Sequence, residues 1–146
     1  MENYEKWGTT IYTITDETIN DYTEKLEKFA DVVKRLPFKP HFQGFLRGDI
    51  LATKPEQWQP LWDMGLWSHF YGIETYNKTA GKYVGKGMNP DKLKQGLIDV
   101  REWFQHPDRG LYKATIAMII GLPGETRESF IDGFNWTIEN MPEQSV

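Results

Sequence analysis

The sequence of 146 residues contains no cysteine. The chain alone therefore cannot form a disulfide, use a thiolate nucleophile, or hold zinc or an iron–sulfur cluster through cysteine ligands. It has only three histidines, and their spacing matches neither HxxxH nor HExxH. This spacing does not favour a histidine-based metal site, and we expect no metal ligand in this chain.

Long apolar runs and an excess of basic charge are also missing. No apolar run approaches the roughly 20 residues of a membrane-spanning helix, and the opening residues MENYEK are not typical of a signal peptide. Lys and Arg number 17 against 21 Asp and Glu, which leaves no basic stripe for phosphates. We therefore expect one cytoplasmic domain over 1–146, with no membrane contact and no nucleic acid bound through a basic face.

Four short runs rich in β-branched and aromatic residues alternate with helical patterns. We expect strands at 8–15, 41–47, 66–74 and 111–120. Helices are expected over 19–33, over 55–65, after the N-cap dipeptide Asn89-Pro90, and around 130–138. A polar stretch at 75–87 is expected to form one or two helical turns at most.

This strand–helix alternation predicts an α/β fold with a parallel sheet, either a small open sheet or an arc of a barrel. Periodicity does not separate the two architectures. In both of them ligands bind at the carboxyl ends of the strands. Those ends carry Asp16, the pair Arg47 and Asp49, the pair Glu74 and Thr75, and the loop 121–125.

Each polar group at these ends also has a simpler interpretation. An Arg beside an Asp can clamp a carboxylate or a ribose, but structural ion pairing is the somewhat commoner role. His69 is more often a core histidine than a base, and the aromatic residues, 14% of the chain, mostly indicate packing. The glycine-rich segment 81–87 lacks a hydroxyl after Lys86 and is not a P-loop, and no nucleophile elbow is present.

Three motifs occur in order along the chain: LPFKPHFQGFLRGDIL at 36–51, the GIE, GKG and Asn-Pro elements within 64–97, and IIGLPGET at 119–126. Together they resemble the radical S-adenosylmethionine (radical SAM) superfamily, in the style of its B12-associated and methylthiotransferase-like members. The resemblance runs from about residue 10 to residue 141. It implies a partial TIM barrel of about four βα units with helices outside.

The resemblance also implies which part of the family's core is present. The family's CxxxCxxC loop follows the first strand, and this chain is expected to correspond to strands 2 to 5, with the cluster loop and the last strand lacking. S-adenosylmethionine is the implied cofactor. A 4Fe-4S cluster is implied only if another chain supplies the cysteines.

The resemblance assigns cofactor-binding roles but no catalytic residue. Glu74, with Gly72 in the same GIE strand, matches the position near the ribose and methionine portion, and Arg47 matches a group that holds the cofactor carboxylate. Asp16 stands where relatives contact the methionine amine. The surface that packs on adenine is matched by Ile119, Gly121 and Pro123.

Two functions follow as expectations. In the first, the chain is part of a split enzyme, and a cysteine-bearing chain completes the barrel. In the second, it is a cysteine-free, non-catalytic relic or a binding module of the same fold. The open edge at 8–15 needs pairing, covering or self-association. An unrelated flavodoxin-like binder is a third alternative.

Overall fold

The computed structural model describes residues 1–109 and 113–141. Its four strands are β1 (Ile11–Ile14), β2 (His41–Leu46), β3 (Leu66–Glu74) and β4 (Lys113–Met118). The helices are α1 (Glu2–Trp7), α2 (Thr23–Val33), α3 (Gly48–Thr53), α4 (Trp58–Asp63), α5 (Lys78–Tyr83), α6 (Pro90–Phe104) and α7 (Arg127–Asn140), with a 3-10 turn η1 (Pro55–Gln57) before α4. In the described residues, no helix is both long enough and apolar enough to cross a membrane.

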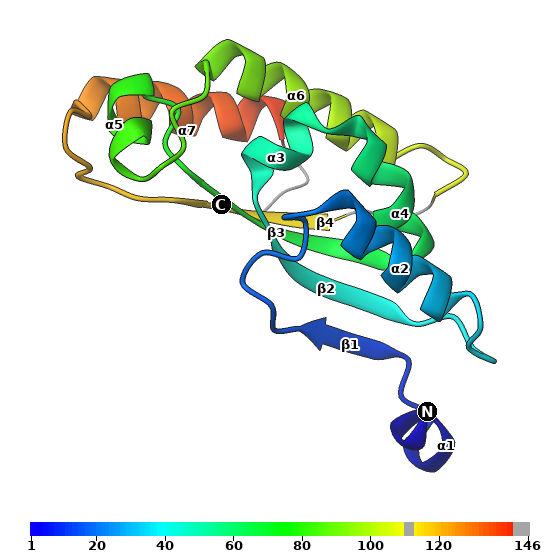
Figure 1. The fold of residues 1–146 in the computed structure, drawn as a ribbon. Coiled ribbons are helices and arrows are strands. Elements are labelled where there is room, and N and C mark those ends of the chain that lie inside the picture. Colours follow the sequence, from blue (N-terminus) through cyan, green and yellow to red (C-terminus); the bar gives the residue numbers. More distant parts are fainter. Residues whose placement is uncertain (110–112, 142–146) are drawn as a thin grey trace.

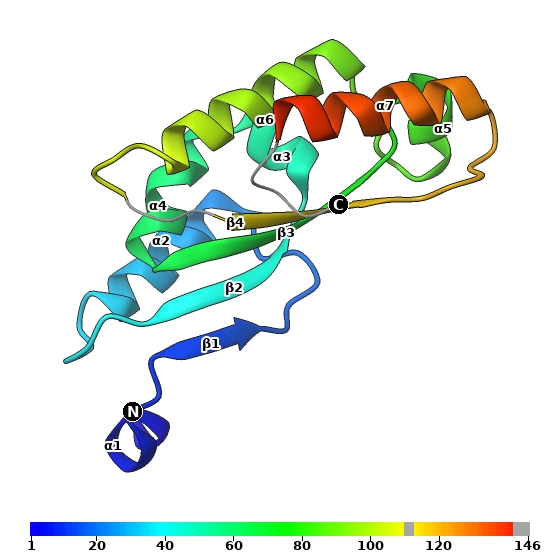
Figure 2. The same ribbon diagram turned by 180° about the vertical axis from the view of Figure 1, so that it is seen from behind.

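The sheet has the order β1-β2-β3-β4, and every neighbouring pair is parallel. Figures 1 and 2 show that the helices from α2 to α7 all lie on one side of this sheet, with α5 beyond the strand ends, while α1 lies apart beside the start of β1. A flavodoxin-like sheet has the order 2-1-3-4-5 and carries helices on both faces. The chain is therefore an α/β barrel arc of four βα units with helices outside, as expected.

The core lies between the sheet and its helical layer. Tyr71 and Ile73 of β3 point into it, and the α6 side chains Leu97 and Phe104 are fully buried against them. The ring of His69 is also buried there, and it contacts the edge of Phe104 with ring centroids 4.8 Å apart. These side chains alternate with those of the other sheet face, as the pleat requires.

Within residues 1–109 and 113–141, the opposite face of the sheet has no helical cover. Phe45 and Phe70 lie side by side on neighbouring strands, with ring centroids 5.1 Å apart, and they are 41% and 38% exposed. Next to them, Gln43 donates a hydrogen bond of 2.7 Å to the Thr13 hydroxyl. This face corresponds to the interior of a complete barrel.

Several expected elements are confirmed and others differ. The strand at 66–74 and the helix after Asn89 are confirmed, and the Asn89 side chain accepts hydrogen bonds from the amides of Asp91 and Lys92. The first strand is shorter than expected, and the first long helix begins only at Thr23 because the Ile19 amide bonds to the Phe45 carbonyl.

The region after β2 was the least well predicted. One helix was expected over 55–65, whereas the chain forms α3, η1 and α4 in succession. Helix α1 was not expected, because it buries none of its residues and so leaves no apolar periodicity. Residues 111 and 112 of the expected fourth strand lie outside the described residues, and the strand ends at Met118 rather than at residue 120.

The turn between α4 and β3 yields a stability prediction. Gly65 has φ +85°, and a Cβ added to it would overlap the carbonyl oxygen of Pro40. We expect Gly65→Ala to lower the free energy of unfolding by more than the roughly 1–2 kcal/mol that a left-handed backbone alone costs an L-residue. Urea denaturation measures this loss.

Gly8→Ala is the matched control. Gly8 also has a positive φ, +65°, but a Cβ there would meet nothing within 4 Å. We expect Gly8→Ala to lower the free energy of unfolding only by the cost of a left-handed backbone at an L-residue. An equal loss for Gly8→Ala and Gly65→Ala would contradict the steric account.

A pH-dependent stability follows from the buried His69. Burial lowers the pKa of this imidazole to about 3. The unfolded imidazole titrates near its ordinary value, so below about pH 6.5 the unfolded state takes up a proton that the folded state does not. Stability conferred by the neutral ring is therefore complete above pH 6.5 and is lost as the pH falls toward 3.

The substitution His69→Gln isolates this effect. Between about pH 7.5 and pH 5.5, we expect the free energy of unfolding of this variant to fall by about 1.4 kcal/mol less than that of the unaltered chain. An unaltered slope in His69→Gln would contradict the prediction. Chemical denaturation at each pH supplies the data.

Candidate functional site

A pocket of about 280 Å³ lies at the carboxyl ends of β2 and β3, on the uncovered face of the sheet. Three residues assigned to the cofactor from the sequence, Arg47, Gly72 and Glu74, line it together. The rest of the lining is Glu17, Thr18, Phe45, Leu46, Phe70 and Lys86. Parallel pairing brings these strand ends to one edge, which explains the convergence of residues far apart in sequence.

The pocket contains an ion pair between Glu74 and Lys86. Lys86 Nζ lies 3.0 Å from Glu74 Oε1, and it also donates to the carbonyl of Gly72. Both side chains are mostly buried, at 21% and 16% exposure, so the pair is less screened than a surface salt bridge. Because Lys86 occupies only one oxygen of the carboxylate in the described part of the chain, Oε2 of Glu74 remains an acceptor.

The absence of a side chain at Gly72 leaves room for this pair. A Cβ added to Gly72 would overlap Glu74 Oε1 and approach Lys86 Nζ to 3.0 Å. Any larger residue would therefore displace the carboxylate or the ammonium group. Gly72 shapes the site through its lack of a side chain.

The backbone at Glu74 is in an uncommon conformation. Its φ is +67°, and it is the one non-glycine residue with a positive φ among the described residues. The carbonyl of Glu74 accepts a 2.9 Å hydrogen bond from the amide of Ile119, which follows β4. The neighbouring strand thus holds the turn that directs this carboxylate, and such strain is often found at functional sites.

Arg47 is held in a fork with Asp49. Its Nε lies 3.1 Å from Asp49 Oδ1 and its Nη2 lies 2.6 Å from Oδ2, and this bonding raises the pKa of Arg47. The buried Asn20 fixes the backbone of Arg47 by bonding to both its amide and its carbonyl. Nη1 is left as the donor for a ligand in the described residues.

Asp16 does not line this pocket. It forms a 2.7 Å ion pair with Lys25 on the surface, and the hydrogen bond from Lys25 lowers the pKa of Asp16. The next two residues, Glu17 and Thr18, do line the pocket. The segment after β1 therefore does reach the site, but it contributes Glu17 to the lining instead of Asp16.

The loop after β4 lies beside the pocket rather than in its lining. Ile119, Gly121 and Pro123 are exposed, and Gly121 has φ +86°. Thr75 donates a hydrogen bond to Glu125 Oε1, which joins this loop to the end of β3. The three residues thus present an exposed surface next to the Glu74 turn.

Lys86 was missed as a site residue. The segment 81–87 was expected only to lack P-loop function and to contribute the GKG element of the family resemblance. The amide of Lys86 bonds to the carbonyl of Gly81 at 2.7 Å, and a Cβ on Gly81 would lie 2.7 Å from the carbonyl oxygen of Lys86. The signal available in the sequence was the pair Gly85 and Gly87 on either side of Lys86, soon after a strand end. Glycines in these positions allow the chain to fold back so that the lysine reaches the strand.

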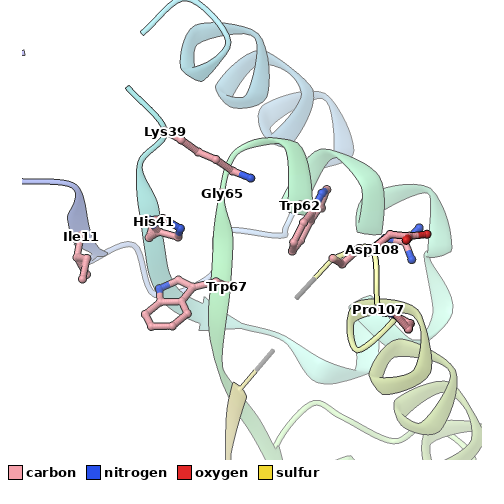
Figure 3. Close-up of a pocket in the computed structure, with 9 residues that line it drawn as sticks. Ile11, Lys39, His41, Trp62, Gly65, Trp67, Pro107 and Asp108 are labelled. Atoms are coloured by element: carbon pink, nitrogen blue, oxygen red, sulfur yellow. The ribbon is translucent and has the colours of Figure 1, made fainter. Parts of the chain in front are cut away.

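A larger pocket, of about 580 Å³, lies at the opposite end of the strands. Figure 3 shows Trp67 and His41 on adjacent strands beside it and Trp62 facing it from α4. Trp67 packs on His41 with ring centroids 5.8 Å apart, and Lys39 Nζ lies 5.4 Å from the Trp62 ring centroid. Because ligands in parallel α/β folds bind at the carboxyl ends, the smaller pocket is the candidate site.

The two groups implied by the resemblance fit the chain differently. An iron–sulfur cluster does not fit, since the sequence offers no cysteine and the described residues contain no group of three His, Asp or Glu that could hold a metal. S-adenosylmethionine fits in part. The pocket offers carboxylate acceptors and a guanidinium donor, but its volume is slightly below the roughly 300–1,000 Å³ typical of ligand pockets.

Comparisons with family models and with curated proteins identify no relative of this chain. No protein-family model matches the chain, and no curated protein matches it. The function is therefore argued from the geometry of the site and from the sequence motifs.

The strained turn at Glu74 can be tested by comparing two substitutions. Glu74→Ala and Glu74→Gly both remove the carboxylate that pairs with Lys86, but only glycine tolerates φ +67° without strain. We expect Glu74→Gly to be more stable than Glu74→Ala by about 1 kcal/mol. Thermal and urea unfolding report the difference. If the alanine variant were equally stable or more stable, the turn would not be strained.

Proposed function

We propose that this chain is a radical SAM core-domain fragment that binds S-adenosylmethionine at the pocket between β2 and β3. The observation that carries the proposal is the convergence of Arg47, Gly72 and Glu74 in one pocket, although each was assigned to the cofactor from the sequence motifs alone. The sequential parallel sheet with helices outside supports the same family.

The cofactor has a zwitterionic amino-acid end, a ribose and an adenine, and the site offers a group for each. Glu74 Oε2 would accept hydrogen bonds from the ribose hydroxyls or the ammonium group. Arg47 Nη1 would donate to the carboxylate, while Asp49 keeps the rest of the guanidinium in place. The exposed side chain of Ile119, beside the Glu74 carbonyl, would pack on adenine.

Lys86 would orient the acceptor. Its ammonium group holds Glu74 Oε1 at 3.0 Å and the Gly72 carbonyl, which leaves the second carboxylate oxygen for the ligand. A positive charge at this place also favours the ligand carboxylate over the sulfonium. We therefore expect the amino-acid end of the cofactor to lie between Arg47 and Lys86.

Radical chemistry would require a second, cysteine-bearing chain that supplies the 4Fe-4S cluster. This chain's own part would be to bind and orient the cofactor. The uncovered β1 edge and the open sheet face are where such a chain would complete the barrel. A cytoplasmic location remains a prediction of the sequence.

The second candidate function is a non-catalytic binding module of the same fold. The complete lack of cysteine favours it, because the chain alone has no means of reducing the cofactor. Both functions share the same cofactor pocket. They differ in whether a cluster-bearing partner is required.

Titration calorimetry of the full chain with S-adenosylmethionine tests the shared pocket. We expect Glu74→Ala to weaken binding about tenfold or more, as the loss of a hydrogen bond to a charged group generally does. Asp63→Ala is the matched control. It also removes a carboxylate that pairs with a lysine, Lys34, but neither residue lines the pocket. No binding by the unaltered chain, or equal affinity of Glu74→Ala, would contradict the proposal.

A further inference from the structure

In the part of the chain that the structure describes, the sheet has an unpaired strand edge at each end. In the described residues, β1 pairs only with β2 and β4 pairs only with β3. Strand β1 has the sequence IYTI, without the charge or proline that commonly protects an edge strand, and β4 carries a single charged residue, Lys113. Each edge therefore exposes backbone donors and acceptors that a parallel strand could pair with.

Helix α7, at the β4 end, carries an uncovered apolar stripe. Ile131, Phe134 and Ile138 recur at helical spacing, and Ile138 is 50% exposed. The other side of α7 is already used, since Gly133 and Thr137 are buried against Tyr76. The stripe thus faces away from the helix's own contacts.

Helix α2, at the β1 end, carries a second uncovered stripe. Tyr22, Phe29 and Val32 line a shallow groove on its outer side, and Val32 is 58% exposed. The inner side of α2 is occupied, because Leu26 and Ala30 are buried in the core. In the described residues, each end helix therefore has one packed side and one exposed side that carries apolar side chains, which on α2 lie among Glu24, Lys25 and Lys28.

Charged side chains flank both stripes. Asp132 and Glu139 flank Ile131 and Ile138 on α7, and both are exposed. The α2 groove is lined by Glu24, Lys25 and Lys28 besides its apolar side chains, and Lys25 is already paired with Asp16 and Asp21. The exposed Lys28 is the cation of the groove that could pair with Asp132 or Glu139 of a second copy, and such pairs orient two surfaces.

We propose that two copies of this chain join head to tail, so that β4 and α7 of each copy pack against β1 and α2 of the other. Head-to-tail contacts form a closed ring when the rotation closes. Four parallel strands are half of an eight-stranded α/β barrel, in which each helix packs beside the helix of the next unit. Two copies would therefore leave no open edge.

The dimer goes beyond cofactor binding and does not depend on it. A cluster-bearing chain would need the same β1 edge that the second copy occupies. The closed dimer would therefore be a binding form of the protein, and a cysteine-bearing chain would have to displace one copy to join the barrel.

Sedimentation of the full chain and of single variants tests this interface. We expect the unaltered chain to form a dimer, and Val32→Glu and Ile138→Glu each to weaken the dimer at least about tenfold by burying a charge. The exposed Tyr83, on α5 and outside both stripes, provides the control Tyr83→Glu, which should leave the dimer intact. Circular dichroism confirms that each variant keeps its fold.

Mixing the two variants tests the head-to-tail arrangement. A Val32→Glu copy and an Ile138→Glu copy can form one unaltered junction, so the mixture should dimerise more tightly than either variant alone. An unaltered chain that stays monomeric, polymers that grow with concentration, a dimer insensitive to both substitutions, or a mixture without rescue would each overturn the proposal.

Discussion

The constraint on which the rest depends is the pairing of four parallel strands in sequence order, with the covering helices on one side. This order brings the carboxyl end of every strand to a single edge, where the candidate pocket lies. In the part of the chain that the structure describes, it also leaves one sheet face and two strand edges without cover. The proposed ligand site and the proposed dimer are consequences of the same topology.

Within the pocket, one chain of contacts connects the fold to the proposed chemistry. The amide of Ile119 holds the turn at Glu74, the missing side chain of Gly72 makes room for the carboxylate, and Lys86 orients it. Arg47 is fixed independently, through Asn20 on its backbone and Asp49 on its guanidinium. Both groups are therefore positioned before any ligand arrives, which reduces the entropy cost of binding.

Much of this could be predicted from local sequence patterns. The alternation of Leu66–Glu74 and the capping residues Asn89 and Pro90 set their elements directly. The contacts within the site could not be predicted from local sequence. Lys86 reaches Glu74 only because a glycine-containing loop folds back on the strand. Asp16 lies outside the pocket because it forms an ion pair with Lys25. Strand order likewise depends on which edges meet in space, whereas periodicity reports only local structure.

The central claim is that S-adenosylmethionine binds at the carboxyl end of β2 and β3. A nuclear magnetic resonance titration of the isotope-labelled chain with S-adenosylmethionine tests it most directly. The account predicts saturable shifts at the backbone amides of Arg47, Gly72, Glu74 and Lys86, with the indole signal of Trp67, in the pocket at the opposite end of the strands, unmoved. Shifts centred on Trp67, or none at the four pocket amides, would contradict it.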